Sequence, residues 1–140
     1  MTTLYDTFGT DQDLEKGSGV TLDYGDAGSI TIHRAGGGNR KFYTVMDAVL
    51  KPHRHAIQNK TLDKETDDRL MAEIYAKSVI IGWSGVKGRD GKKLPFNEAN
   101  AIKLLTDLPD LFADIRANAM SIDTFRKEAQ EQEAKNSAKS

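Results

Sequence analysis

Residues 20–32 read VTLDYGDAGSITI, and this stretch decides the fold class of the 140-residue chain. Apolar and polar residues alternate on both sides of a turn that contains Gly25 and Gly28, a pattern typical of two antiparallel strands. We therefore expect a β-hairpin. Because an isolated hairpin is only marginally stable in water, its apolar face must pack on helices or on a neighbouring subunit.

Outside the hairpin, helical spacing of apolar residues dominates. Four segments show it: one from about Arg40 to Pro52 with a continuation over 53–58, one from Thr61 or Asp63 to Gly82 or Gly85, one that Asn97 caps, and one that begins at Pro109. The last apolar stripe runs from Leu111 to Phe125, about four turns. These patterns predict a mostly helical α+β fold of four to five helices with an N-terminal β-hairpin.

Composition limits the classes of protein that the chain can form. With 38% apolar and 29% charged residues, the chain is slightly poor in core material for one domain. The lack of cysteine excludes disulfides, thiolate catalysis and cysteine-ligated zinc. No apolar run approaches the roughly 18 residues of a membrane span, and the N-terminus lacks a signal pattern, so we expect a cytosolic protein without membrane contact.

Charge is unevenly distributed along the chain. Residues 1–26 hold six acids and one lysine, a net charge of −5, whereas residues 32–60 hold six basic residues and one acid, a net charge of +5. Attraction within the fold explains this better than nucleic-acid binding. We expect residues 1–16 to form a flexible acidic arm, 17–127 a single α+β domain, and 128–140 a polar C-terminal tail.

The sequence gives no strong catalytic or metal motif. His53 and His55 could coordinate a metal, but residues two apart on a helix point away from each other. The glycine-rich stretch 34–41 superficially resembles a phosphate loop, yet it lacks the Gly-Lys-Ser/Thr ending, and a flexible connection fits it better. We expect no catalytic residue, no metal and no cofactor.

Trp83, the only tryptophan, stands at a break between a helical pattern and a loop rich in glycine and lysine. The indole and the last apolar stripe fit either the core or a surface that another chain covers. The residues expected at a partner contact are Trp83, Leu94, Phe96, Leu111, Phe112, Ile115, Ile122 and Phe125. A basic surface, if used, would comprise Arg34, Arg40, Lys41, Lys51 and Arg54.

Six short motifs occur in an order that resembles a known family. They are IHRAGGGNRKF (32–42), KPHR (51–54), GWSGV (82–86), LPF (94–96), LPDL (108–111) and FRKE (125–128). Over residues 17–128 the chain is similar to the tail assembly chaperones of long-tailed bacteriophages. None of the motifs is a catalytic signature, so the resemblance rests on their order.

The resemblance implies a non-enzymatic, homo-oligomeric protein in the cytoplasm of the infected bacterium. Such chaperones bind the tape measure protein, keep it soluble until the tail tube polymerises, and are absent from the mature virion. The family often makes a longer, frameshifted product, through which the tail tube protein would be a second partner. The Ala134-Lys135-Asn136 stretch is compatible with the slippery codons GCA-AAA-AAC, which the gene sequence would settle.

Two alternatives from other classes stay open. A structural virion component, such as a tail or connector subunit, would also oligomerise and carry a hairpin. A nucleic-acid-binding phage protein would use the basic 34–54 segment and bind in a strongly salt-dependent way. An enzyme is the least favoured class.

Overall fold

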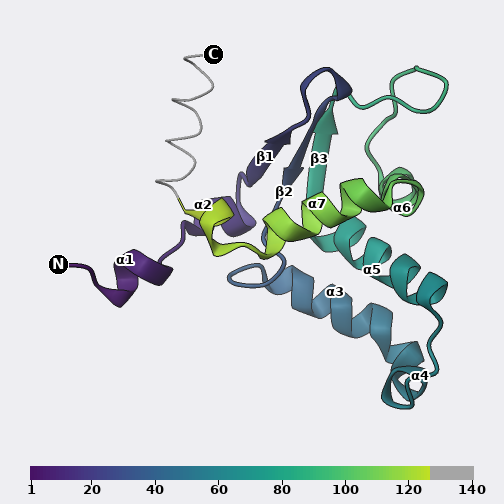
Figure 1. Cartoon of the computed structure of the whole chain (residues 1–140), viewed down its shortest axis with the longest axis horizontal. Helices are drawn as coiled ribbons and strands as arrows, with labels where there is room; N and C mark the ends of the chain where they lie inside the picture. The colour runs from purple at the N-terminus through teal and green to yellow at the C-terminus, as the bar shows by residue number, and fades with distance from the viewer. Residues whose placement is uncertain (127–140) are drawn as a thin grey trace.

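The predicted hairpin forms, and a third strand joins it in the computed structural model, which describes residues 1–126 (Figure 1). Strand β1 (Val20–Asp23) pairs with β2 (Ser29–Ile32), which pairs in turn with β3 (Ile80–Ser84). Both pairings are antiparallel, and β2 is the central strand. The predicted class, mostly helical α+β with an N-terminal hairpin, is confirmed.

Strand β3 corrects the expectation that a helix continues to Gly82 or Gly85. The helix ends at Ser78, and the next residues turn into the sheet, where Ile30 faces Trp83 and Ile32 faces Ile80. A helix at this position would leave one edge of β2 without backbone partners, and the β-branched residues of 79–81 suit a strand. Spacing alone cannot separate a buried strand from the end of a buried helix.

The other regular elements of the described residues are seven α-helices and three 3₁₀ turns. The helices are α1 (Leu4–Phe8), α2 (Gln12–Lys16), α3 (Arg40–Leu50), α4 (Arg54–Gln58), α5 (Lys64–Ser78), α6 (Glu98–Asp107) and α7 (Pro109–Met120). Only α3, α5, α6 and α7 have ten or more residues. All four start where expected. Arg40 and Pro109 are the first residues of α3 and α7, and Asp63 and Asn97 cap α5 and α6 through their side chains.

The last helix is shorter than its apolar stripe predicts. The backbone leaves the helix at Ser121, and Ile122–Phe125 form a 3₁₀ turn. This break lets Phe125 enter the core, where its side chain is fully buried, while its carbonyl accepts a hydrogen bond from the Asp11 amide. Burial of an aromatic side chain offsets the loss of one helical turn.

Helix α5 packs against α3 on one side and α6 on the other, and it leads directly into β3 (Figure 1). Its Tyr75 is almost fully buried and meets two rings edge to face, Phe42 of α3 at 6.1 Å and Phe112 of α7 at 5.2 Å between centroids. Edge-to-face contact is a favoured geometry for aromatic rings. The α5 helix thus connects the helical layer to the sheet.

Residues 1–16, expected as a flexible acidic arm, contain α1 and α2, and the second helix is attached to the rest of the fold through Glu15. The predicted polar tail at 128–140 and the Ala134-Lys135-Asn136 stretch lie outside the described residues. The division into an arm, one domain and a tail stays a prediction.

The hairpin turn gives a first testable prediction. Gly28 has φ of 113°, and a Cβ there would lie 2.7 Å from the Ser84 carbonyl oxygen, whereas Gly25 has φ of 66° and open space around it. We expect Gly28→Ala to lower the free energy of unfolding by about 2–4 kcal/mol through strain and collision, and Gly25→Ala by only about 1 kcal/mol. Urea unfolding of both variants checks this, and equal costs would contradict the close approach.

Candidate partner-binding surface

The Trp83 indole fastens a loop to the end of the sheet. Its Nε1–H donates a hydrogen bond to the Leu94 carbonyl at 2.8 Å, and its ring meets Phe96 edge to face at 5.0 Å between centroids. Trp83 and Leu94 are half-buried, whereas Phe96 is exposed. Three of the predicted contact residues therefore lie together, and the indole holds the loop between β3 and α6 in one place.

That loop is a small, strongly basic ribbon. Lys87 pairs with Lys93 in an isolated β-bridge, and Gly91, with φ of 76°, permits the tight turn between them. Four basic residues lie within 87–93 against one aspartate, a net charge of +3. The sequence expectation placed the basic surface at 34–54 and missed this one, although the lysine and glycine content of 87–93 is visible in the sequence.

Between this ribbon and α6 lies an apolar groove of about 300 Å³, here called the loop groove. Its lining residues are Lys87, Gly88, Arg89, Leu94, Asn100, Lys103, Leu104, Asp107 and Leu108. Leu108 is 46% exposed, and three leucines supply the apolar part of the lining. Two cations of the rim, Arg89 and Lys103, share Asp107 at 3.7 and 3.4 Å, so the rim as a whole stays positive.

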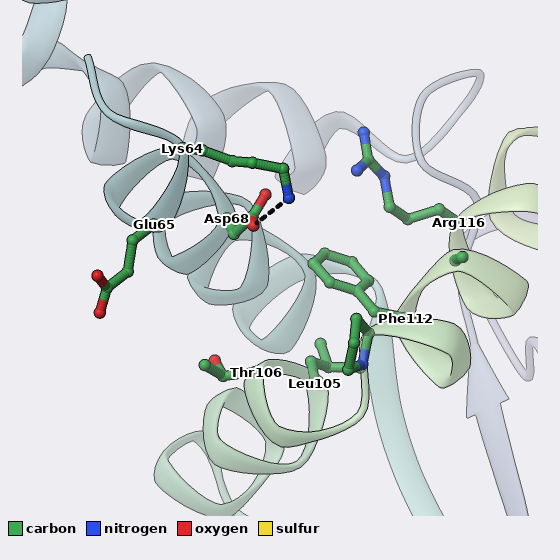
Figure 2. A pocket seen from close by; sticks show the side chains of 9 residues that line it. Lys64, Glu65, Asp68, Leu105, Thr106, Phe112 and Arg116 are labelled. Carbon is green, nitrogen blue, oxygen red and sulfur yellow. Dashed lines mark hydrogen bonds and ion pairs between the residues drawn. The ribbon is translucent and has the colours of Figure 1, made fainter.

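A second and larger hollow of about 610 Å³, here called the helix hollow, lies among α5, α6 and α7 (Figure 2). Its lining residues are Lys64, Glu65, Asp68, Leu105, Thr106, Pro109, Phe112, Ala113 and Arg116. The Phe112 ring points from α7 into the space between Asp68 and Leu105 (Figure 2). The floor is apolar, and the rim carries charges of both signs.

The charged rim of the helix hollow is itself ordered. Lys64 and Asp68, one turn apart on α5, form an ion pair at 3.2 Å, and the Arg116 guanidinium lies 5.4 Å from the centroid of the Phe112 ring. Such cation–π contact covers part of an otherwise open aromatic face. The two hollows lie on opposite sides of α6, because Leu104 of the loop groove projects about 100° from Leu105 and about 160° from Thr106 on a helical wheel.

The remaining predicted contact residues are distributed differently. Ile115 and Phe125 have no exposed surface and belong to the core, while Leu111 and Ile122 are half-buried. Phe112 is mostly buried in the core, and it also lines the helix hollow. The eight residues consequently do not form one continuous surface.

The residues of the expected basic surface also separate. Arg54 pairs with Asp47 at 2.6 Å, and Arg34 pairs with Glu15 at 2.6 Å. Arg40 and Lys41 lie at the start of α3, and Lys51 follows its other end. The rise of about 1.5 Å per residue separates the two ends by about 15 Å, so these cations form no single cluster.

The glycine-rich loop that superficially resembles a phosphate loop binds the carboxylate of Glu15, a residue of the same chain. Glu15, 1% exposed, accepts hydrogen bonds from Arg34, the Gly38 amide, Thr10 and Gln12 at 2.6–3.1 Å. Burial opposes the charge, but the hydrogen bonds from Arg34, Gly38 and Thr10, with the charge of Arg34, hold the pKa of Glu15 below its ordinary value. The loop therefore fixes α2 to the fold.

The described residues offer little else for chemistry. Within 1–126 no group of three or more histidine, cysteine or acidic side chains is placed to hold a metal ion. His55 lies 3.0 Å from the Asn59 side-chain amide, at the exposed end of α4. Among the described helices, none combines the length and apolar character needed to cross a bilayer.

Both hollows, the basic ribbon and Trp83 lie in a part of the chain that matches a known protein family. A family model described as YdaY prophage protein matches residues 37–136, which is 100 of the 140 residues. The chain belongs to this prophage protein family. The match includes every residue that lines the two hollows. No curated protein and no solved structure matches the chain.

The Glu15 cluster gives a second prediction. Glu15→Gln removes the counterion of Arg34 and puts an amide against donors, and we expect it to lower the free energy of unfolding by about 2–4 kcal/mol at pH 7. Asp26→Asn, the same chemical change at an exposed turn residue, should cost less than about 0.5 kcal/mol.

The pH dependence of the same variant separates charge from packing. Because the folded pKa of Glu15 lies below its ordinary value of 4.5, its charge contributes stability above pH 4.5, and this is lost as the pH falls through the folded pKa. Urea unfolding between pH 7 and pH 3 should show a weaker acid dependence for Glu15→Gln than for the parent. Parallel pH curves would contradict this role.

Proposed function

We propose that this prophage protein is a non-enzymatic tail assembly chaperone that binds the tape measure protein and keeps it soluble until the tail tube polymerises. The observation that carries the proposal is the helix hollow, an open apolar space with a charged rim on the face formed by α5, α6 and α7. Membership of a prophage family and the resemblance of motifs 32–128 to tail assembly chaperones support it.

The shape and chemistry of the hollow suit one face of an amphipathic helix. Pro109, Ala113 and the outer edge of Phe112 offer apolar contact for side chains that project from such a helix at i and i+3 or i+4. Lys64, Glu65 and Arg116 can meet polar residues of either sign on its flanks. A tape measure protein is long and helical, and its apolar stripes need cover before the tube encloses them.

The contact should be modest and reversible. Phe112 is already mostly buried against Tyr75, so a guest helix gains only the outer part of this ring and its neighbours. Weak single contacts become effective when many copies bind one long ligand. Release to tail tube subunits then needs only a better-fitting partner. We place this activity in the cytoplasm of the infected bacterium, with the chaperone absent from the finished virion.

One observation favours a second candidate, a nucleic-acid-binding phage protein. The ribbon 87–93 carries a net charge of +3 on an exposed loop, which could neutralise phosphates without reading sequence. In that case binding of nucleic acid would weaken steeply with salt and would depend on Lys87, Arg89, Lys92 and Lys93. Binding of a helix in the helix hollow would show neither dependence.

A third prediction tests the chaperone proposal. Ala113 is exposed on α7 and lines the helix hollow, so Ala113→Glu puts a carboxylate over the apolar floor without disturbing the core. We expect it to weaken binding of a soluble tape measure fragment from the same prophage at least about tenfold, since a guest helix would have to strip water from the new carboxylate in order to cover the apolar floor. Calorimetric titration at micromolar concentration measures the difference.

The matched control is Ala117→Glu, one turn further along α7, exposed but outside the hollow. It should bind the fragment as the parent does. If the parent fails to bind the fragment at micromolar concentration, the proposed function is wrong. If both variants bind equally well, the hollow is the wrong site.

A further inference from the structure

Helix α1 presents an apolar face that nothing in the described part of the chain covers. Leu4, Tyr5 and Phe8 are 75%, 88% and 64% exposed, and no residue of the helix is buried. Leu4 and Phe8 are four residues apart and share one face. A capping box stabilises the N-terminus of the helix: the Thr3 hydroxyl accepts a hydrogen bond from the Asp6 amide, and the Asp6 carboxylate accepts one from the Thr3 amide. This ordered helix thus exposes three large apolar side chains.

The position of α1 separates it from the groove that could receive it in its own chain. Helix α2 is fixed by the Glu15 cluster, and residues 9–11 link it to α1, a span of about 10 Å when extended. Arg126 also donates a hydrogen bond to the Asp6 carbonyl oxygen at 2.7 Å, which holds α1 at this end of the molecule. Along the longest axis of the molecule, α1 lies at one end and the 87–93 ribbon at the other (Figure 1). The loop groove can therefore take α1 only from another copy.

The two surfaces are complementary in both polarity and charge. Residues 4–13 contain Asp6, Asp11 and Asp13 and no basic residue, a net charge of −3, while the next acid, Glu15, is already paired with Arg34. The rim of the loop groove carries three cations and one acid, and its apolar lining comes from three leucines. An acidic helix with Leu4 and Phe8 on one face matches an apolar groove with a basic rim.

We propose that α1 of one copy docks in the loop groove of the next, with Leu4 and Phe8 against the leucine lining and Asp6 facing the basic rim. The contact joins two different surfaces, so it is head-to-tail and produces open chains or, if the rotation closes, rings. It uses the opposite face of α6 from the helix hollow, and it is therefore independent of the proposed tape measure contact. A ring or chain of this kind would leave every helix hollow open.

The test is mutual complementation of two variants of the full chain, followed by sedimentation velocity without any tape measure fragment. An arm variant, Leu4→Ser with Phe8→Ser, changes only exposed side chains, and a groove variant, Leu108→Glu, puts a charge into the apolar lining. Each variant alone should self-associate at least about tenfold more weakly than the parent. Mixed together, the two variants should form one-to-one dimers and nothing larger. The groove variant keeps an intact α1, and the arm variant keeps the intact loop groove that receives it.

Several results would overturn this proposal. The first is that the parent protein stays monomeric at all concentrations. The second is that either variant alone still assembles, the groove variant through arm-to-arm contact. The third is that the mixture of the two variants gives no dimer. Met120→Ser, which changes another highly exposed apolar residue outside both surfaces, should assemble like the parent. Circular dichroism confirms that each variant is folded, and added salt should weaken the parent's assembly.

Discussion

The pairing of β3 with β2 is the constraint on which the rest of the structure depends. It ends α5 at Ser78, gives the hairpin a third strand, and places Trp83 opposite Ile30 at the point where the chain leaves the sheet. From there the indole holds the ribbon and Phe96 in position, and α6 and α7 follow. Both hollows have α6 as a wall, so their shape depends on this one pairing.

Electrostatic attraction within the chain organises the opposite end of the molecule. The uneven charge of the sequence appears in the fold as the pair between Glu15 of the acidic segment and Arg34 of the basic one. The glycine-rich loop supplies a backbone amide to the same carboxylate, which fixes α2 and leaves α1 projecting beyond it (Figure 1). The binding of Glu15 therefore explains both why α2 is fixed to the fold and why α1 is left uncovered.

Local signals in the sequence predicted the hairpin and the starts of α6 and α7, because turn glycines, the Asn97 cap and Pro109 act over a few residues. The third strand, the break at Ser121 and the Glu15 cluster depend on partners distant in sequence, which spacing does not reveal. Within the candidate site, Trp83 and Phe96 were both expected at a partner contact, but they lie in two separate motifs, and spacing does not reveal that their rings meet. The rim residues Lys64 and Asp68 resembled an ordinary solvated helix face.

The proposed role of the helix hollow is to bind an amphipathic helix of the tape measure protein. Amide hydrogen exchange of the full chain, with and without a soluble tape measure fragment, tests it most directly. Binding in the hollow should slow exchange in residues 64–68 and 105–116, which border it. Unchanged exchange in both segments, with slowing confined to the 87–93 ribbon or to α1, would contradict it.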